Sequence, residues 1–422
     1  MKVRIGKNPL HKGQVRIISS KSDGHRSLIA AALAEEESVL FVDGWSEDLE
    51  ATVRCLRALG AEIYQEPSGI EIIPIPRNAE KEAVLDCGES GSTLRFLLPV
   101  AAALGGKTVF EGAGRLPERP IGILLEELAQ HGCTVSRDKL PVEISGKLES
   151  GVYRLPGNIS SQFITGLLFA LPLLEVDSEI RLTTDIESKG YIDMTLKILK
   201  IFGVEIVENE HGWFIPGGQA YNGPRMRFTE GDWSNAAFWL TAGAIQGSIG
   251  CQGLDMESAQ GDRAIVSILE EFGAETKMIL NQITVTRKEM KGIRIDASQI
   301  PDLVPILCIA GAAAEEKTEI YNAGRLRMKE SDRLAVMAEC LKKLGVEVEE
   351  REDGLLITGG CNSPEEEIII DSHNDHRIVM AMAIAAVSLG VDITIENADA
   401  VNKSYPSFFA ELKKLGGVVD VL

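Results

Sequence analysis

A short pattern, in which the end of an amphipathic helix runs through a glycine into a strand, occurs six times in this 422-residue chain. Successive copies start 70 to 72 residues apart, at Leu56, Leu128, Leu199, Leu269, Leu341 and Leu412. Glycine adopts the left-handed backbone conformation at little cost, so each copy predicts a helix end followed by a strand. This period exceeds the roughly 20–50 residues of solenoid repeats. The copies therefore predict a few large units that pack in groups.

Each unit is predicted to read strand–helix–strand–helix–strand–strand, because an apolar helix also follows a polar segment at the front of each copy. These front helices, such as IVMAMAIAAVSLG at 378–390, are apolar on all sides and are expected to be buried. We predict an α/β (α+β) fold of two similar domains. Each domain would hold three such units packed around buried helices, as an inside-out α/β barrel.

The ends of the chain predict that one domain is discontinuous. The sixth copy ends at Leu422 before a last strand can form, whereas the chain opens with KVRIGK at 2–7, a strand without a helix of its own. We expect this strand to complete the sixth unit. The first domain, with units one to three, is then predicted to span 19–224, and the second to join 1–18 with 225–422.

The acidic composition limits the partners of the chain. It has 43 Lys and Arg against 63 Asp and Glu, a formal net charge of −20. Nucleic acids and anionic membranes need a net basic face, so we expect neither as a partner. No secretory signal and no apolar run long enough to span a bilayer is evident. The seven cysteines form no C-x-x-C pair, which favours reduced thiols and a cytoplasmic location.

Basic residues occur where several helices are predicted to begin. A helix N-terminus already carries partial positive charge, so lysine or arginine is unfavourable there unless an anion binds beside it. If the domains face each other, these residues line one cleft that concentrates anionic ligands. They are Lys21, Arg26, Arg115, Arg119, Lys329 and Arg333 (an i, i+4 pair), Arg377, and Lys403, which is expected to open the last long helix.

Three acidic residues, Asp302, Glu330 and Asp332, occur among these basic residues. They can be ion-pair partners of Lys329 and Arg333, or they can transfer protons beside bound anions. The spacing alone favours neither explanation.

The ordered set of segments resembles the 5-enolpyruvylshikimate-3-phosphate synthase family of enolpyruvyl transferases over essentially the whole chain. The segments are SKSDGHR (20–26), ERPIG (118–122), SSQF (160–163), IPD (300–302), KESDR (329–333), NDHR (374–377) and Lys403. The resemblance implies a two-domain fold of six units. It also implies transfer of the enolpyruvyl group of phosphoenolpyruvate to the 5-hydroxyl of shikimate 3-phosphate, with release of phosphate and without a cofactor or metal.

The resemblance also implies roles for individual residues. Asp302 would be the general base at the 5-hydroxyl, Glu330 the proton-transfer group at the methylene carbon, and Lys21 a catalytic residue that touches both substrates. The first substrate-binding motif includes Ser22 and Arg26, and the residues implied on the shikimate side are Ser160, Ser161, Gln162, Ser188 and Lys329. Those implied on the phosphoenolpyruvate side are Gly91, Arg119, Arg333, Arg377 and Lys403.

Some residues depart from the family pattern or have simpler explanations. Glu89 and Arg325 stand where the family often has other residues, so neither is assigned to the site. His373 and His376 are expected to make capping or loop contacts rather than bind a metal. We expect His25 on the surface, and Trp233 and Trp239 in the core.

Two other functions remain open at this point. The sister enzyme that acts on UDP-N-acetylglucosamine would need a reactive cysteine at 111–121, which this sequence lacks. A non-catalytic phosphate-binding scaffold would not need Asp302 and Glu330. The substrates are expected to be small molecules and the protein a monomer.

Overall fold

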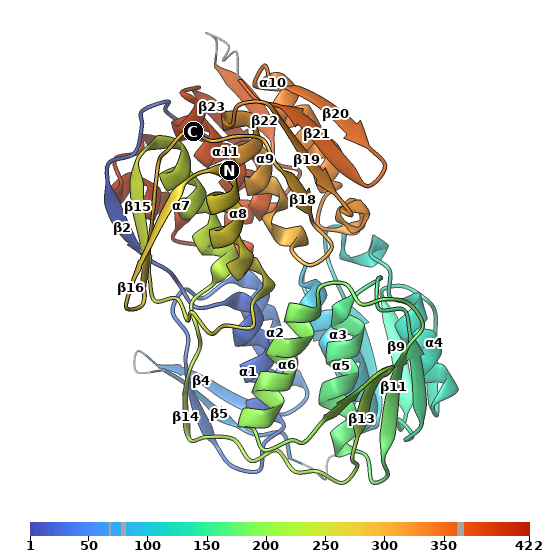
Figure 1. The fold of residues 1–422 in the computed structure, drawn as a ribbon. Coiled ribbons are helices and arrows are strands. Elements are labelled where there is room, and N and C mark those ends of the chain that lie inside the picture. Colours follow the sequence, from blue (N-terminus) through green and yellow to red (C-terminus); the bar gives the residue numbers. More distant parts are fainter. Residues whose placement is uncertain (67–68, 77–81, 361–366) are drawn as a thin grey trace. The chain divides into compact units, whose positions relative to one another are not determined.

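The computed structural model describes residues 1–66, 69–76, 82–360 and 367–422 (Figure 1). The chain divides into two compact units, which we call the N-terminal domain (Ser19–Thr229) and the C-terminal domain (Met1–Ile18 with Glu230–Leu422). Each domain has its own cluster of buried hydrophobic side chains.

The N-terminal domain contains three four-stranded sheets with the strand orders β14-β3-β5-β4, β6-β7-β9-β8 and β10-β11-β13-β12. The first two strands of each sheet are parallel and the remaining pairs are antiparallel. The strands are β3 (Ser38–Phe41), β4 (Glu62–Glu66), β5 (Gly69–Ile73), β6 (Glu82–Asp86), β7 (Lys107–Glu111), β8 (Cys133–Val135), β9 (Val142–Gly146), β10 (Val152–Leu155), β11 (Ser178–Leu182), β12 (Val207–Asn209), β13 (Gly212–Ile215) and β14 (Met226–Phe228).

The C-terminal domain repeats this arrangement with the orders β2-β15-β17-β16, β18-β19-β21-β20 and β22-β23-β1-β24. Its strands are β1 (Val3–Ile5), β2 (Gly13–Arg16), β15 (Ser248–Gln252), β16 (Glu275–Ile279), β17 (Gln282–Thr286), β18 (Arg294–Asp296), β19 (Lys317–Tyr321), β20 (Glu347–Arg351), β21 (Gly354–Thr358), β22 (Ile368–Asp371), β23 (Ile393–Glu396) and β24 (Val419–Val421).

Each domain has a set of buried helices and a set of amphipathic ones, as the apolar and the mixed sequence patterns require. The buried helices are α1 (Lys21–Ala32), α3 (Gly91–Leu104), α5 (Ser161–Ala170), α7 (Trp233–Gln246), α9 (Val304–Ala313) and α11 (His376–Leu389). The amphipathic helices are α2 (Glu47–Ala58), α4 (Gly122–Gln130), α6 (Lys189–Ile201), α8 (Ile265–Phe272), α10 (Arg333–Lys343) and α12 (Phe408–Lys414). Short 3-10 turns are η1 (Leu116–Glu118), η2 (Leu171–Leu173), η3 (Gly261–Ala264), η4 (Pro301–Leu303), η5 (Gly324–Met328) and η6 (Ala398–Lys403).

The predicted fold class, with its repeated units around buried helices, is confirmed. The predicted role of the first strand is also confirmed, because β1 pairs with both β23 and β24 and completes the sixth sheet. The glycines that were expected to end the helices all have positive φ angles, between 74° and 109°: Gly60, Gly132, Gly203, Gly273, Gly345 and Gly416.

Two strands pair differently from what the repeat alone suggests. β14 lies parallel to β3 in the N-terminal domain, although residues 226–228 were assigned to the second domain. β2 lies parallel to β15 in the C-terminal domain, although it directly precedes α1 of the N-terminal domain. The first sheet of each domain thus takes its first strand from a distant part of the chain. A strand pattern specifies an extended segment and its buried face but does not specify its partner.

Among the described residues, no helix has the length and hydropathy that crossing a bilayer requires. Trp233 and Trp239 are fully buried, as expected. Six cysteines are free and buried, and Cys361 lies outside the described residues.

Candidate active site

The segment SKSDGHR forms the start of α1, with Ser20 as the capping residue. Ser20 caps the helix by accepting a hydrogen bond from the backbone N–H of Asp23 at 3.3 Å. Lys21 is the first helical residue, and its Nζ lies 2.8 Å from Oδ2 of Asp48 on α2. Ser22 follows on the same turn and is half-buried. The capping serine fixes the start of the helix, so Lys21 and Ser22 lie on its first turn.

Arg26 is buried and bound by neutral groups. Its Nε donates to Thr195 Oγ1 at 2.9 Å, and its two terminal nitrogens donate to the backbone oxygens of Tyr191 and Ser22 at 2.8 and 2.7 Å. The guanidinium also lies over the ring of Phe96, 5.1 Å from its centroid. Burial lowers the pKa of Arg26 to about 10. Arg26 therefore joins α1 to α6 within the domain.

Gly91 and Arg119 lie in close contact. A Cβ atom at position 91 would come within 2.6 Å of the Arg119 guanidinium, so a larger residue would displace this side chain. Gly91 begins α3, and Ser90 caps that helix through the N–H of Thr93 at 3.2 Å. The start of α3 thus presents backbone N–H groups beside an arginine, which is an arrangement suited to an anion.

Arg95, one turn further along α3, is a buried cation that the motifs did not reveal. It donates to Gln162 Oε1 at 2.7 Å and to the backbone oxygen of Pro120 at 3.1 Å. Burial, and then the charge of Arg119, hold the pKa of Arg95 well below its ordinary value. A basic residue four positions after a helix start was the available signal, but the apolar helix around it predicted only core packing.

The SSQ segment lies at the start of α5 and joins this cluster. Ser160 caps α5 through the N–H of Gln162 at 3.3 Å, and Ser161 is the first, buried residue of the helix. The Gln162 side chain connects Arg95 to Ser92, to which it donates at 2.9 Å. Ser188, also buried, precedes α6 in a left-handed conformation with φ of 55°.

His25 is fully buried, so its expected surface position is wrong. Its Nδ1 lies 2.7 Å from Thr52 Oγ1. Thr52 Oγ1 lies 2.7 Å from Thr93 Oγ1, and Thr93 Oγ1 donates a hydrogen bond to Ser90 Oγ at 2.8 Å. Burial lowers the pKa of His25 to about 3. The neutral imidazole thus belongs to a hydrogen-bonded chain that leads to the cap of α3.

In the C-terminal domain, three cations converge on Asp302 of η4. Arg333 donates to its Oδ1 at 2.8 Å, Arg377 approaches its Oδ2 at 3.3 Å, and the Nζ of Lys329 lies 3.9 Å from Oδ1. Lys329 and Arg333 do not form the expected helical i, i+4 pair, because α10 begins only at Arg333. Both contact Asp302 instead, which relieves their mutual repulsion.

Arg333 is held by a second carboxylate, Asp375, the capping residue of α11. Its Nε lies 2.7 Å from Asp375 Oδ2, to which Ser331 also donates at 3.0 Å. Burial alone would lower the pKa of Arg333, but Asp375, Glu330 and Asp302 outweigh it and raise that pKa. Likewise, Arg333 outweighs burial and keeps the pKa of Asp375 below its ordinary value.

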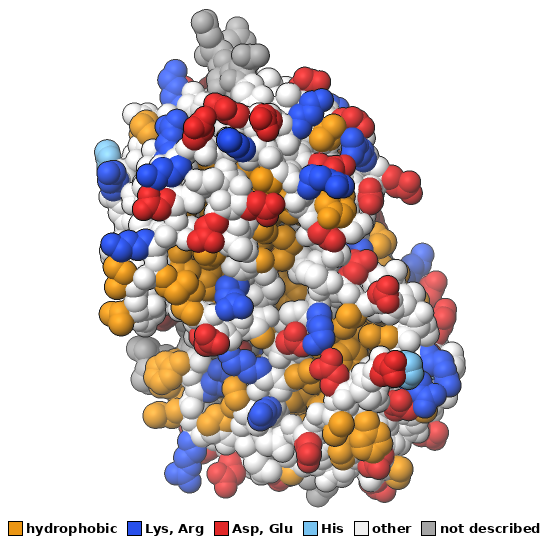
Figure 2. Space-filling view, in the orientation of Figure 1, with side chains coloured by type: hydrophobic (Ala, Val, Ile, Leu, Met, Phe, Trp, Pro, Cys, Tyr) orange, Lys and Arg blue, Asp and Glu red, His pale blue; other side chains and the backbone are white. Residues whose placement is uncertain are grey.

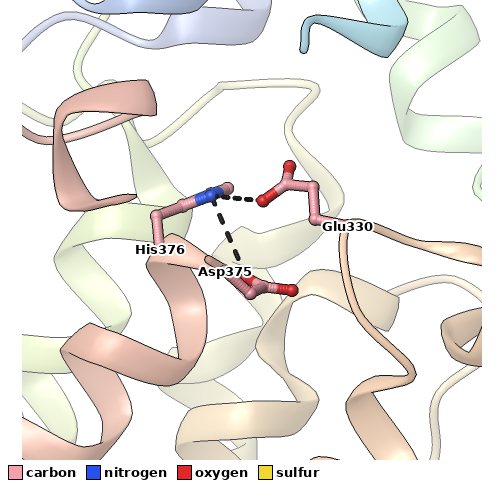
Figure 3. Close-up of side chains that lie close together, drawn as sticks. All are labelled: Glu330, Asp375 and His376. Atoms are coloured by element: carbon pink, nitrogen blue, oxygen red, sulfur yellow. Dashed lines mark hydrogen bonds and ion pairs between the residues drawn. The ribbon is translucent and has the colours of Figure 1, made fainter. Parts of the chain in front are cut away.

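Glu330 contacts His376, the first residue of α11 (Figure 3). The Oε2 of Glu330 lies 2.7 Å from His376 Nδ1 and 3.7 Å from Arg333. Glu330, Asp375 and His376 offer ligand atoms within 4.8 Å of one another. Because Arg333 already contacts both carboxylates, a metal ion would have to compete with a guanidinium, and we expect none.

Lys403, the last proposed site residue of this domain, does not open a helix. Lys403 was predicted to open a long helix, but it ends η6, and α12 begins five residues later and has only 7 residues. Pro406 between them disfavours a continuous helix. The Nζ of Lys403 donates to the backbone oxygen of Asn374 at 2.7 Å, next to Asp375.

The two residues left out of the site also have defined neighbours. The carboxyl group of Glu89 packs against Gly114, where a Cβ atom would lie 2.5 Å from it. Arg325 donates to the backbone oxygen of Ser298 at 2.8 Å.

Two clusters therefore contain most of the proposed residues. In the N-terminal domain, Gly91, Arg119 and Gln162 gather around Arg95, while Lys21 and Arg26 share the start of α1. In the C-terminal domain, Asp302, Lys329, Glu330, Arg333 and Arg377 form one network. Among the described residues on the face shown in Figure 2, acidic and basic side chains are interspersed, and the basic ones form no extended patch.

Comparisons with known proteins identify the family. A family model described as EPSP synthase (3-phosphoshikimate 1-carboxyvinyltransferase) matches residues 6–412. The 3-phosphoshikimate 1-carboxyvinyltransferase of Clostridium acetobutylicum is 45% identical over 415 residues, which cover 97% of this chain and 96% of the relative. The enzyme of the same name from Clostridium kluyveri is 44% identical over 412 residues, covering 97% and 96%.

Solved structures agree with these relatives. An EPSP synthase structure from Acinetobacter baumannii has a TM-score of 0.82 and 27% identity, and the match covers 100% of both chains. The enolpyruvyl transferase NikO from Streptomyces tendae has a TM-score of 0.81 at 18% identity, covering 99% of this chain and 98% of that one, and supports the fold alone. The resemblance inferred from the motifs is confirmed, and the chain belongs to the EPSP synthase (3-phosphoshikimate 1-carboxyvinyltransferase) family.

Proposed function

We propose that this protein transfers the enolpyruvyl group of phosphoenolpyruvate to the 5-hydroxyl of shikimate 3-phosphate by addition and elimination, with release of phosphate. The observation that carries the proposal is the network in which Lys329, Arg333 and Arg377 surround Asp302. Both substrates carry several negative charges, and fixed cations stabilise the charge that develops during such a reaction.

The C-terminal network supplies groups for both proton transfers. Asp302 would accept the proton of the 5-hydroxyl, since the surrounding cations favour the carboxylate form that a general base requires. Glu330 would transfer the proton at the methylene carbon, and the contact with His376 at 2.7 Å fixes its carboxyl group. Arg333, Arg377 and Lys403 would bind phosphoenolpyruvate, and Lys329 the phosphate of shikimate 3-phosphate.

The N-terminal domain supplies binding groups. Ser22, Arg26, Ser160, Ser161, Gln162 and Ser188 would bind shikimate 3-phosphate, and Gly91 with Arg119 would bind phosphoenolpyruvate. Lys21, held by Asp48, would contact both substrates. Arg26 also holds α1 and α6 together, through its bonds to Thr195 and to the backbone oxygen of Tyr191.

We also propose that the enzyme acts as a monomer in the cytoplasm, with small molecules as its ligands. Its free buried cysteines suit a reducing compartment. Light scattering of the purified protein would show a single 45.7 kDa species if the monomer proposal is correct.

The reaction is tested by measuring phosphate release. Release should require both phosphoenolpyruvate and shikimate 3-phosphate, whereas release only with UDP-N-acetylglucosamine would support the sister activity. Binding of both substrates without any release would support a non-catalytic scaffold.

Variants test the assigned roles. Asp302→Asn, Glu330→Gln and Lys21→Met should each lower kcat more than they raise KM. Lys107→Met and Glu339→Gln remove exposed ion-pair partners that have no role in the proposed site, and they serve as controls. A variant that loses affinity alone would have a binding role instead.

A further inference from the structure

Asp262 is a buried carboxyl group that the roles above do not use. It lies in η3 with 2% of its surface exposed. Its Oδ2 accepts a hydrogen bond from Ser234 Oγ on the first turn of α7. Its Oδ1 is buried and has no hydrogen-bond partner among the described residues. A buried carboxyl with an unsatisfied oxygen is costly as an anion, so this environment favours the neutral acid.

Two of the three charged groups that act on Asp262 belong to the proposed site. They are Asp302 on η4, Arg377 on α11 and Asp232, which caps α7. Burial, and then the charge of Asp302, raise the pKa of Asp262 to about 7, although Arg377 and the Ser234 hydroxyl partly oppose them. The carboxyl group therefore changes charge near neutral pH.

The position of Asp262 is fixed by its neighbours. Gln260 accepts from the N–H of Trp233 at 3.0 Å and donates to the backbone oxygen of Gly231 at 2.8 Å. Asp262 binds Ser234 from the same segment, so residues 260–262 hold the start of α7 at two points. A substitution of the carboxyl by an amide of the same shape can keep this arrangement.

We propose that Asp262 is a positioning residue of the phosphoenolpyruvate side, and that it must be uncharged for an anion to bind tightly beside Arg377. This inference rests on the proposed function. In its acid form, Asp262 holds α7 through Ser234 without adding charge. Once ionised, it adds a second negative charge that repels the Asp302 carboxylate and competes with the anion for the positive potential of Arg377.

The coupling between anion binding and the ionisation of Asp262 determines how the affinity for the anion changes with pH. A bound anion makes ionisation of Asp262 harder, so it raises the pKa of Asp262 further. The neutral form then binds the anion more tightly, and affinity is full below about pH 7 and falls as the pH rises above it. Each unit by which the bound anion raises this pKa corresponds to a roughly tenfold loss of affinity at high pH.

The test compares KM for phosphoenolpyruvate in the wild type and in Asp262→Asn from about pH 6 to 9, at saturating shikimate 3-phosphate. The ratio of wild-type to variant KM should rise about tenfold over this range. Ionisation of the substrate affects both proteins equally and cancels in the ratio. Ser234→Ala removes a hydrogen bond that favours the carboxylate, so it should move the midpoint of the rise to higher pH.

A constant KM ratio across this range, in enzymes that do release phosphate, would overturn the inference and leave the proposed function intact. Absence of phosphate release by the wild type at every pH would instead overturn the proposed function. Infrared difference spectra between wild type and Asp262→Asn give a readout without turnover. They should show a protonated carboxyl band that disappears through about pH 7, and its absence at pH 6 would also overturn the inference.

Discussion

The two domains hold their buried arginines in opposite ways. In the N-terminal domain, Arg26 and Arg95 donate to hydroxyl, amide and backbone oxygens, all of them neutral. In the C-terminal domain, Arg333 and Arg377 contact the carboxylates of Asp302 and Asp375. Both sets give the guanidinium groups polar partners, but only the second set also neutralises their charge.

The pKa directions follow from this difference. Burial dominates in the N-terminal domain and lowers the pKa of Arg26 and Arg95, whereas carboxylates dominate in the C-terminal domain and raise the pKa of Arg333. An anionic substrate would therefore relieve an electrostatic cost around Arg95. Around Arg333 the carboxylates already relieve it, and there they can serve in proton transfer. Similar repeats can therefore supply binding charge in both domains and acid/base groups in only one of them.

The largest effect is expected from Arg333→Met. This change leaves the buried Asp375 without its cation, which should lower the free energy of unfolding by about 3–5 kcal/mol. Urea denaturation measures it. The double variant Arg333→Met/Asp375→Asn removes both charges and should recover part of the loss. Equal stability of the single variant and the wild type would show that the carboxylates do not depend on Arg333.

Mild acid should weaken the N-terminal domain through His25. Its pKa is about 3 when folded against 6.5 for the free side chain, so only the unfolded state binds the proton between these values. Stability is therefore full above pH 6.5 and falls by about 1.4 kcal/mol per pH unit below it, or about 2 kcal/mol at pH 5.

Hydrogen exchange at pH 7 and pH 5 would locate this loss in the N-terminal domain. His25→Gln cannot take up the proton and should flatten the pH dependence. If the variant and the wild type lose stability in parallel, another group is responsible.

Arg95→Met should affect stability much less than Arg333→Met does. Because the partners of Arg95 are neutral and its burial is costly, its loss should change the free energy of unfolding by only about 1 kcal/mol. The KM for phosphoenolpyruvate should still rise about tenfold, since a buried cation beside Arg119 is lost. Urea denaturation and steady-state kinetics measure the two effects. A stability loss as large as that of Arg333→Met would remove the distinction between the domains.

The smallest effect is expected from Glu89→Gln. Glu89 places a carboxylate two residues before Gly91, so removing its charge should lower KM for phosphoenolpyruvate by about two- to threefold, the size of a partly screened interaction. Kinetics at low and high salt measure it, and the difference should shrink at high salt. An unchanged KM at low salt would mean that Glu89 does not act on this part of the site.

Local features of the sequence predicted much of the fold. Six glycines with positive φ angles end the repeated helices, and the lone strand at the N-terminus completes the sixth sheet. The basic residues at helix starts also pointed to Lys21, Arg333 and Arg377. Each of these signals depends on a few neighbouring residues, such as the conformational freedom of glycine or the charge at a helix end.

The sequence did not reveal which distant residues these elements would contact. Asp375 pairs with Arg333 although 42 residues separate them, and Arg95 meets Gln162 across 67 residues. His25 looked exposed because its own segment is polar, yet Thr52 of α2 contacts it in the interior. The sequence by itself determined the repeat, its helix ends and the classes of residue at the site. The tertiary structure alone decided which strand joins which sheet and which charge meets which, because long-range pairing depends on how separate elements pack.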